Sequence, residues 1–198
     1  MTNFKAYYTE KYGLNETQFE EIKSLVTYKK IEKGAFLLHP GEICQHSFFV
    51  EKGLLRSYTI DEQGKEHIIQ FAPENWIISD RSSSFFNEPS EFYIDAIEDT
   101  EFILIDTTFI QKASELSTSF RQFNDRALQN HIRSLQKRIN LLIGANAETR
   151  YMDFITNYPD LLLRVPQWMI ASYLGITPES LSRVRKELAK RNFKPKFD

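Results

Sequence analysis

Residues 167–186 read QWMIASYLGITPESLSRVRK, and this stretch decides how the C-terminal part of the chain folds. Two helices that cross near a right angle need a small residue at the crossing and a residue that tolerates positive φ at the turn. Ala171 and Gly175 meet these two needs. The apolar residues that would close the wedge between the helices are Ile170, Leu174, Ile176, Leu181 and Val184. The spacing therefore predicts a helix-turn-helix at about residues 166–190.

The second of these helices has a well-marked beginning. Thr177 is a good N-cap, Pro178 suits the first helical position, and Glu179 places a negative charge near the positive end of the helix dipole. A helical hairpin whose charged side chains are merely solvated is the ordinary alternative. The wedge residues in register and the charge of the segment argue against that alternative.

The chain carries a basic end on an acidic body. Its formal net charge is −2, but residues 164–198 contain eight basic and three acidic residues, which gives +5 there and −7 elsewhere. A basic segment is the electrostatic footprint of a protein that binds a polyanion. Combined with the helix-turn-helix, this charge predicts that residues 146–198 form a domain that binds double-stranded DNA, with the second helix in the major groove.

The outward face of the second helix supplies the candidate DNA contacts. We expect Thr177, Glu179 and Arg183 to read bases, because arginine can donate two hydrogen bonds to guanine and glutamate can accept one from cytosine N4. Phosphate contacts position a protein on DNA without reading sequence. The residues expected to make them are Gln167, through main-chain N–H groups, and Ser180, Arg185, Lys186, Lys190 and Arg191.

The N-terminal part of the chain changes from helical to strand-like patterns. Residues 1–22 are predicted to be helical, with Asn15 beginning a second short helix that has Phe19, Ile22 and Val26 on its apolar side. Short runs rich in β-branched and aromatic residues follow, separated by glycine turns, at residues 47–50, 54–60, 67–71, 92–97 and 102–105. Closely spaced strands with regular turns indicate a barrel or roll. Residues 1–116 are therefore predicted to form a β-roll domain.

Residues 109–144 return to helical periodicity. A stripe of apolar residues recurs there at alternating spacings of four and three, at Leu128, Ile132, Leu135, Ile139 and Leu142. This repeat is typical of a two-stranded coiled coil. We expect residues 117–145 to be the helix through which a homodimer forms. The alternative is that the stripe packs on the chain's own β-roll. A second apolar line at Phe120, Phe123 and Ala127 could cover the β-roll instead, which would leave the stripe free for a second chain.

In this order the segments resemble the Crp/Fnr family of bacterial regulators along nearly the whole chain. The motifs that carry the resemblance are Lys33-Gly34, HPGE at 39–42, FFVEKG at 48–53, DEQGKE at 61–66 and ITPESLSR at 176–183. The resemblance implies an α+β fold: a jelly-roll-like sensor domain related to cyclic-nucleotide-binding domains, a central dimerisation helix and a winged helix-turn-helix. It also implies regulation of transcription together with RNA polymerase. The wing is expected to be short, since only Asn192 to Asp198 follow the recognition helix.

The chain departs from the family where cyclic nucleotides are held. Members that bind them combine a Gly-Glu pair with an Arg-Ser pair around the cyclic phosphate. No glycine lies between Gly64 and Gly144 here, and Glu91 would bring a carboxylate to the phosphate, with Arg81 as the one available substitute. We therefore do not expect cyclic AMP to be the effector.

A pocket for another effector remains a hypothesis. A small apolar or amphipathic molecule could lie between the roll and the helix. The residues expected to line that pocket are Phe71, Trp76, Arg81, Ser90, Glu91, Tyr93, Asn124 and Asn130, with Phe85 and Phe86 nearby. The alternative is that these aromatic residues are simply core and that the protein has no effector. Any effector is expected to act at a hinge near residues 144–146.

The sequence offers little support for other classes of protein. The four histidines show no metal-ligand spacing, although strands could bring His46 near His67, and no nucleophile elbow, P-loop or dinucleotide motif is present. We expect no metal, no cofactor and no enzymatic activity. The single Cys44 excludes an intramolecular disulfide and a cluster on several thiolates. A β-roll that senses a small molecule and acts through protein partners without binding DNA is the remaining alternative.

The apolar runs are far shorter than the roughly 20 residues that a membrane-spanning helix needs. The N-terminal residues also lack an apolar signal core. These observations predict a cytoplasmic protein with no membrane segment.

Overall fold

The computed structural model describes residues 2–192. Its contacts divide the chain into two compact units, Met1–Asn130 and His131–Asp198. The long helix α5, Thr118–Gly144, is continuous across that boundary and contributes to both units. The predicted boundaries at residues 116 and 145 remain predictions.

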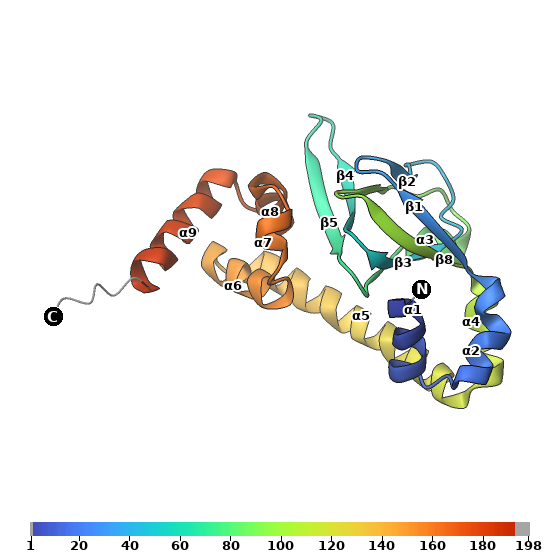
Figure 1. Cartoon of the computed structure of the whole chain (residues 1–198). Helices are drawn as coiled ribbons and strands as arrows, with labels where there is room; N and C mark the ends of the chain where they lie inside the picture. The colour runs from blue at the N-terminus through green and yellow to red at the C-terminus, as the bar shows by residue number, and fades with distance from the viewer. Residues whose placement is uncertain (1, 193–198) are drawn as a thin grey trace. The chain divides into compact units, whose positions relative to one another are not determined.

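The first unit is built on two four-stranded antiparallel sheets (Figure 1). One sheet has the order β1 (Thr27–Ile31), β8 (Thr100–Ile105), β3 (Ser47–Lys52) and β6 (Ile77–Ile78). The other has the order β2 (Phe36–Leu38), β7 (Tyr93–Ala96), β4 (Leu55–Ile60) and β5 (Glu66–Ala72). The predicted β-roll is therefore confirmed.

Side chains of the first sheet alternate between two separate cores, one on each face. Phe48, Val50 and Phe102 lie in the cluster between the sheets, whereas Phe49 and Ile103 belong to a second cluster on the opposite face. This alternation follows from the period of two in a strand. The helices α2 (Glu16–Ile22) and α4 (Thr107–Leu116) supply the second cluster, together with α1 (Thr2–Ala6) and the π-helix η1 (Tyr7–Lys11).

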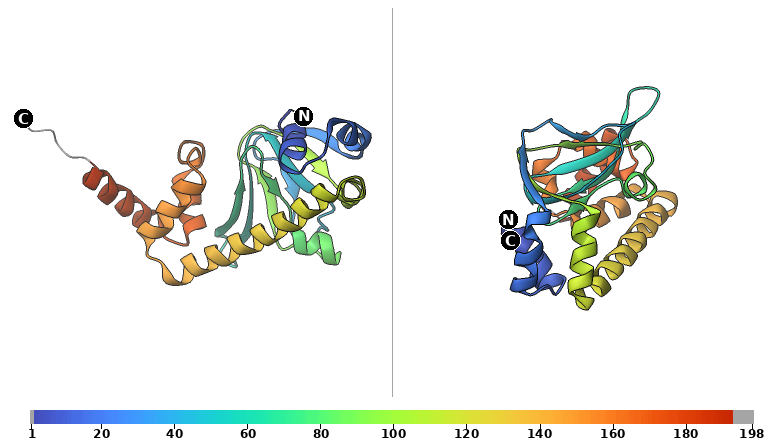
Figure 2. Two further views of the ribbon diagram at one scale, coloured as in Figure 1. Left: turned by 90° about the horizontal axis from the view of Figure 1, so that it is seen from below. Right: turned by 90° about the vertical axis from the view of Figure 1, so that its right-hand side faces the viewer.

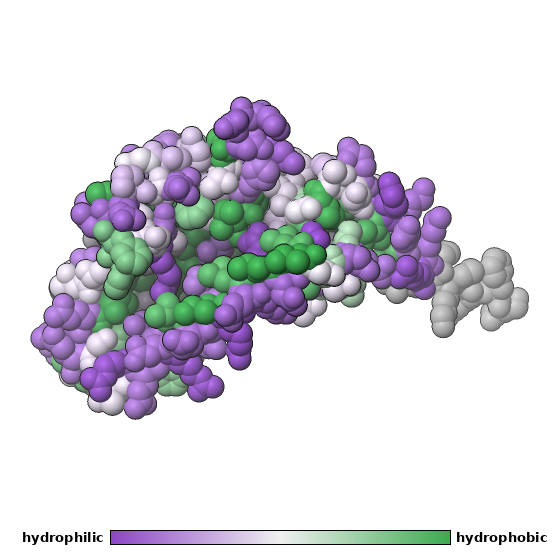
Figure 3. All heavy atoms as spheres, turned by 180° about the vertical axis from the view of Figure 1, so that it is seen from behind, coloured by the Kyte–Doolittle hydropathy of each residue, from purple (hydrophilic) through white to green (hydrophobic). Residues whose placement is uncertain are grey.

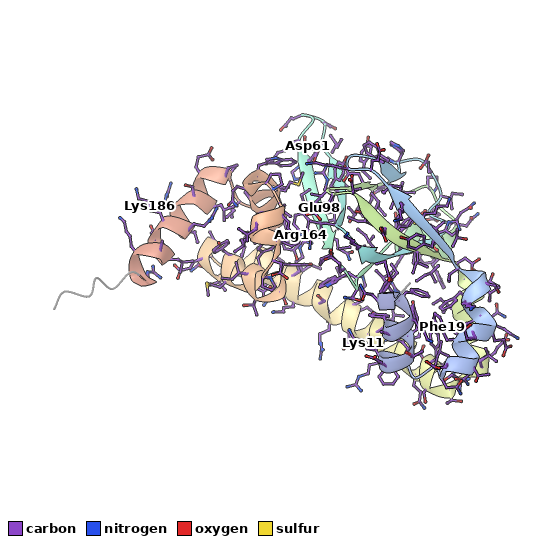
Figure 4. All side chains as sticks on the ribbon, viewed as in Figure 1. Lys11, Phe19, Asp61, Glu98, Arg164 and Lys186 are labelled. Atoms are coloured by element: carbon purple, nitrogen blue, oxygen red, sulfur yellow. The ribbon has the colours of Figure 1, made fainter. Side chains whose placement is uncertain are left out.

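Aromatic rings and a buried carboxylate attach the N-terminal helices to the sheet. Phe4 contacts Phe49 edge to face with ring centroids 5.2 Å apart. Glu51, which is buried, accepts hydrogen bonds from the backbone N–H groups of Asn3 and Phe4, each at 2.9 Å. This carboxylate satisfies donors that the first turn of α1 would otherwise leave unpaired. Figure 4 labels Phe19 on α2, whose ring joins the same core.

The first residues of α5 pack against the core that the N-terminal helices form, as the second apolar line of this helix predicts. Phe120 is fully buried and Ala127 packs against the cluster. Phe123 only partly fits that prediction, because its side chain remains 46% exposed while its ring contacts Tyr12.

The second unit adds four helices after α5 (Figure 2). They are α6 (Ala147–Asn157), α7 (Leu161–Arg164), α8 (Gln167–Leu174) and α9 (Pro178–Asn192). Tyr151, Phe154 and Leu161 are buried in this unit, and the rings of Phe154 and Tyr158 lie 5.3 Å apart. The predicted wing falls on residues 193–198 and so lies outside the described residues.

Among residues 2–192, no helix combines the length and the apolar character that crossing a membrane would require.

The glycine at the end of β3 gives a direct test of the β-roll. Gly53 has φ of +102°, and a Cβ there would lie 2.6 Å from Thr100 Oγ1 and 2.7 Å from the Asp99 carbonyl oxygen. We expect Gly53→Ala to lower the free energy of unfolding by more than about 2 kcal/mol, measured by urea denaturation. Gly64→Ala is the control, because Gly64 has φ of +78° but open space around it, and it should cost about 1 kcal/mol. Equal losses would contradict the close packing at Gly53.

Candidate nucleic-acid interface

The turn between α8 and α9 has the geometry that the sequence predicts. Ala171 is fully buried at the crossing, and Gly175 adopts the left-handed conformation with φ of 64°. The N–H groups of Gly175 and Ile176 donate to the carbonyls of Ser172 and Ala171, each at 3.0 Å. These bonds satisfy carbonyl groups that the last turn of α8 leaves open. Of the wedge residues, Ile170, Leu174, Leu181 and Val184 are buried and Ile176 is half-buried.

The beginning of α9 is fixed by its own side chains. Thr177 Oγ1 accepts a hydrogen bond from the backbone N–H of Ser180 at 3.2 Å, which is an N-cap contact. Hydrogen bonding from its own backbone N–H, and then from the Thr177 hydroxyl, holds the pKa of the Glu179 carboxyl below its ordinary value. Glu179 is therefore ionised at neutral pH and able to accept a hydrogen bond.

One face of α9 is exposed over its whole length. Thr177, Glu179 and Arg183 are all exposed on the helix whose opposite side buries Leu181 and Val184. Figure 4 shows Lys186 on the side of α9 that points away from α8. Glu179 and Arg183, four positions apart, share an accessible face of the helix, and Thr177 is exposed at its N-cap. The roles of these three residues toward DNA stay predictions.

The residues expected to contact phosphates differ in their surroundings. Arg185, Lys186 and Lys190 are exposed, whereas Ser180 is half-buried beside Thr177. Gln167 is the first residue of α8, so its N–H has no acceptor within the helix. Arg191 donates from Nη1 to Glu148 Oε1 of α6 at 2.6 Å. A phosphate contact by Arg191 would have to compete with this ion pair.

Two arginines that sequence reasoning missed brace the helix-turn-helix. Arg150 on α6 donates to the carbonyls of Leu142 at 2.8 Å, Ala145 at 3.0 Å and Leu174 at 3.1 Å. Arg138 on α5 lies over the ring of Tyr173, with the guanidinium carbon 3.9 Å from the ring centroid. These contacts join the ends of α5 and α8 within the second unit. A movement at the predicted hinge, residues 144–146, would have to break the hydrogen bonds of Arg150.

The apolar stripe of α5 is solvent-accessible in the single chain. Its members are exposed to similar extents: Leu128 40%, Ile132 41%, Leu135 43%, Ile139 56% and Leu142 37%. Figure 3 shows hydrophobic residues gathered in bands at the surface on the face it presents. Repeated leucine and isoleucine side chains left partly in water mark a surface that another protein surface can cover.

In the region that the family resemblance assigns to a cyclic phosphate, this chain has a buried hydrogen-bond network. Asp80 caps helix α3 (Arg81–Phe86) by accepting from the Ser83 N–H at 3.1 Å, and it accepts from the Ser90 hydroxyl at 2.7 Å. Asp80, Ser83 and Ser90 are buried, whereas Arg81 and Glu91 are exposed. The serine therefore faces a carboxylate, which would repel a phosphate.

The remaining residues of the predicted effector pocket lie in varied environments. Phe71 is fully buried, Trp76 is 39% exposed, and Tyr93 stacks on Tyr58 with ring centroids 5.1 Å apart. Asn124 is half-buried and Asn130 exposed on α5. Phe85 and Phe86, also expected near the pocket, are 83% and 64% exposed. The pocket stays a prediction.

A buried ion cluster lies on the second sheet and was not found from the sequence. Arg56 donates to both carboxylate oxygens of Asp95, at 2.7 and 2.8 Å, and to Glu66 at 2.5 Å. Burial disfavours the guanidinium cation, but the hydrogen bonds and charge of Asp95, and then of Glu66, outweigh burial and raise the pKa of Arg56. Arg56 is 10 residues from Glu66 and 39 from Asp95, and the pairing of β4 with β5 and β7 brings the three side chains together.

Within residues 2–192, no group of three histidine, cysteine or acidic side chains is placed to hold a metal ion. His67 instead contacts Asp61, with Nε2 2.7 Å from Oδ2.

Known proteins resemble both the sequence and the fold. Residues 28–115 match the family model described as a cyclic nucleotide-binding domain. The chain is 28% identical over 185 residues to electron transport regulator A of Shewanella oneidensis and to the fumarate and nitrate reduction regulatory protein of Escherichia coli K12. In both cases the alignment covers 87% of this chain and 73% of the relative.

Solved structures share the fold. FixK2 from Bradyrhizobium japonicum aligns with a TM-score of 0.71 and 21% identity, covering 84% of this chain and 85% of that one. A transcriptional regulator described as crp/fnr family, from Eubacterium rectale, aligns with a TM-score of 0.65 and 17% identity, covering 96% and 89%.

The chain combines a β-roll, a long helix and a helix-turn-helix in this order, and FixK2 shares this fold. The family match over residues 28–115 and the named relatives support the resemblance to the Crp/Fnr family. The two relatives are named as regulators.

The N-cap of α9 can be tested by substitution. Thr177→Ala removes the acceptor of the Ser180 N–H and should lower the free energy of unfolding by about 1 kcal/mol, measured by urea denaturation. Thr177→Ser keeps the hydroxyl and should remain within a few tenths of a kcal/mol of wild type. If the alanine variant matched wild type, the cap would contribute nothing to stability.

Proposed function

We propose that the chain is a homodimeric, sequence-specific DNA-binding transcription regulator that inserts α9 into the major groove. The observation that carries this proposal is the buried crossing of Ala171 with the left-handed turn at Gly175. It leaves Glu179 and Arg183 together on an exposed helix face. In such a motif the N-terminal part of the second helix meets the base edges.

Dimerisation through α5 is the second element of the proposal. Covering the exposed stripe from Leu128 to Leu142 with the same stripe of a second chain would remove five apolar side chains from water. A two-fold dimer with recognition helices roughly 34 Å apart would match successive major grooves on one side of the duplex.

The effector remains part of the proposal. Cyclic AMP is disfavoured because Ser90 is engaged by the buried Asp80 carboxylate and Arg81 is exposed. A small apolar or amphipathic molecule held between the roll and α5 would bias the dimer only if it binds one arrangement more tightly than another. The proposal includes a cytoplasmic location and action together with RNA polymerase.

Base reading and phosphate binding should respond differently to mutation. Arg183→Ala is expected to abolish selectivity at one position of the site, at a cost of about 1–3 kcal/mol, since it removes a bidentate contact with guanine. Lys190→Ala, the matched control, should weaken binding to all sequences alike and lower the salt dependence. Gel-shift titration against selected and scrambled duplexes measures both. Unchanged base preferences in Arg183→Ala would show that this residue does not read bases.

The dimer helix has its own test. Leu135→Asp should produce monomers in sedimentation velocity, because a carboxylate buried in a coiled-coil seam is not paired. Ser134→Asp adds the same charge one position off the stripe, on an exposed residue, and should leave the dimer intact. A stable dimer of Leu135→Asp would assign the stripe to another role.

A further inference from the structure

A hollow of about 330 Å³ opens into the β-roll of the first unit. Its lining comes from β1, β8 and β3 of the first sheet, from the edge strand β2 of the second sheet, and from the loop that joins β2 to β3. Its size is in the range of small-molecule sites.

The floor of the hollow is apolar. Leu38, Cys44, Phe48 and Phe102 line it and are each 5% exposed or less. Burial raises the pKa of the Cys44 thiol, so this side chain is neutral and behaves as an apolar group. Phe36, Ile43 and Leu104 extend the apolar lining toward the opening.

The rim carries polar groups of both signs. Lys29 lies opposite Phe102 in the β1–β8 register, and directly paired residues of antiparallel strands share a face, so its side chain belongs to the face that lines the hollow. Gln45 and His46 add hydrogen-bonding groups. Glu42 also lines the rim, but its Oε2 already accepts the His39 N–H at 2.8 Å. The amine of Lys29 is thus the charged group best placed to receive a ligand.

The hollow is held open by hydrogen bonds in the loop that forms one side of it. The Gly41 N–H donates to the Ser90 carbonyl and the Ser90 N–H to the Glu42 carbonyl, both at 2.8 Å. The Cys44 N–H donates to Ser83 Oγ of α3 at 2.9 Å. A ligand would therefore meet a preformed site and would not have to order the loop, which lowers the entropic cost of binding.

From these features we propose that the hollow binds a small amphipathic monoanion, an aliphatic carboxylate whose hydrocarbon chain lies on Phe48 and Phe102 and whose carboxylate pairs with Lys29. An inward-facing lysine also protects an edge strand from pairing with other chains. Protection of the edge strand requires no ligand, so direct binding measurements distinguish it from carboxylate binding.

The test is calorimetric titration of the full chain with octanoate, 1-octanol and octylammonium. Octanoate should bind saturably at one site per chain, about tenfold more tightly than octanol, because only the anion gains a charge-assisted hydrogen bond. Octylammonium should bind more weakly than either. No saturable binding of octanoate, or octylammonium binding as tightly, overturns the proposal.

Two lysine variants on one strand give a matched comparison. Lys29→Gln should weaken octanoate binding about tenfold and leave octanol unchanged. Lys30→Gln removes the same charge from the next residue, which faces the other way and pairs with Glu101 at 2.7 Å, and should leave both ligands unaffected. An unaltered octanoate affinity in Lys29→Gln contradicts the assignment of that amine.

A third measurement locates the ligand without depending on a variant. Octanoate should shift the methyl NMR signals of Leu38 and Leu104 in the wild-type chain, and those of Leu128 and Ile132 much less. Shifts confined to the residues of α5 would place the ligand elsewhere and overturn the proposal. None of these experiments includes DNA, so their failure leaves the DNA-binding function untouched.

Discussion

The left-handed turn at Gly175 is the constraint on which the C-terminal unit depends. The reversal after α8 needs positive φ, and an L side chain at Gly175 would both strain the backbone and bring its Cβ within 3.1 Å of Leu142 Cδ2. With the turn fixed and Ala171 small enough for α9 to approach, Leu181 and Val184 must point inward. The helix period then leaves Glu179 and Arg183 outward. The accessible face of α9 is thus a consequence of packing on its other side.

Side chains also join the C-terminal end of α8 to the end of α5. The Arg150 guanidinium donates to carbonyls at two helix ends, Leu142 and Ala145 at the end of α5 and Leu174 at the end of α8. It therefore satisfies acceptors that helix ends leave unpaired. Arg138 adds a cation–π contact with Tyr173 in the same unit. These contacts connect α5 to the helix that precedes the recognition helix.

Helices, strands and turns that carry a local sequence signal could be predicted, while elements without such a signal could not. The turn at Gly175, the cap at Thr177 and the strands β3, β4, β5, β7 and β8 have local signals that the structure confirms. Strand β1 was missed because Tyr28 and the two lysines that follow it show no apolar alternation, and β2 and β6 have only three and two residues. The exposure of the α5 stripe agrees with a dimer seam, but a single chain does not show its partner.

Side-chain networks were the least accessible to sequence reasoning. Arg56, Glu66 and Asp95 meet only because a bulge and two strand pairings set the register. Asp80 and Ser90, ten positions apart, form one buried hydrogen bond in the region that the family resemblance assigns to a cyclic phosphate. The absence of the glycine cassette was visible in the sequence, whereas the carboxylate that takes its place was not. Side-chain contacts of this kind depend on the folded backbone and have no periodic pattern in the sequence.

The most direct test of the account is to select genomic DNA fragments with the full-length protein, sequence them, and map the protected bases. The account predicts an enriched inverted repeat whose two half-sites lie about one helical turn apart, both protected on one side of the duplex. Fragments without a shared motif, or protection of a single unrepeated site, would contradict the dimeric recognition by α9 on which the account depends.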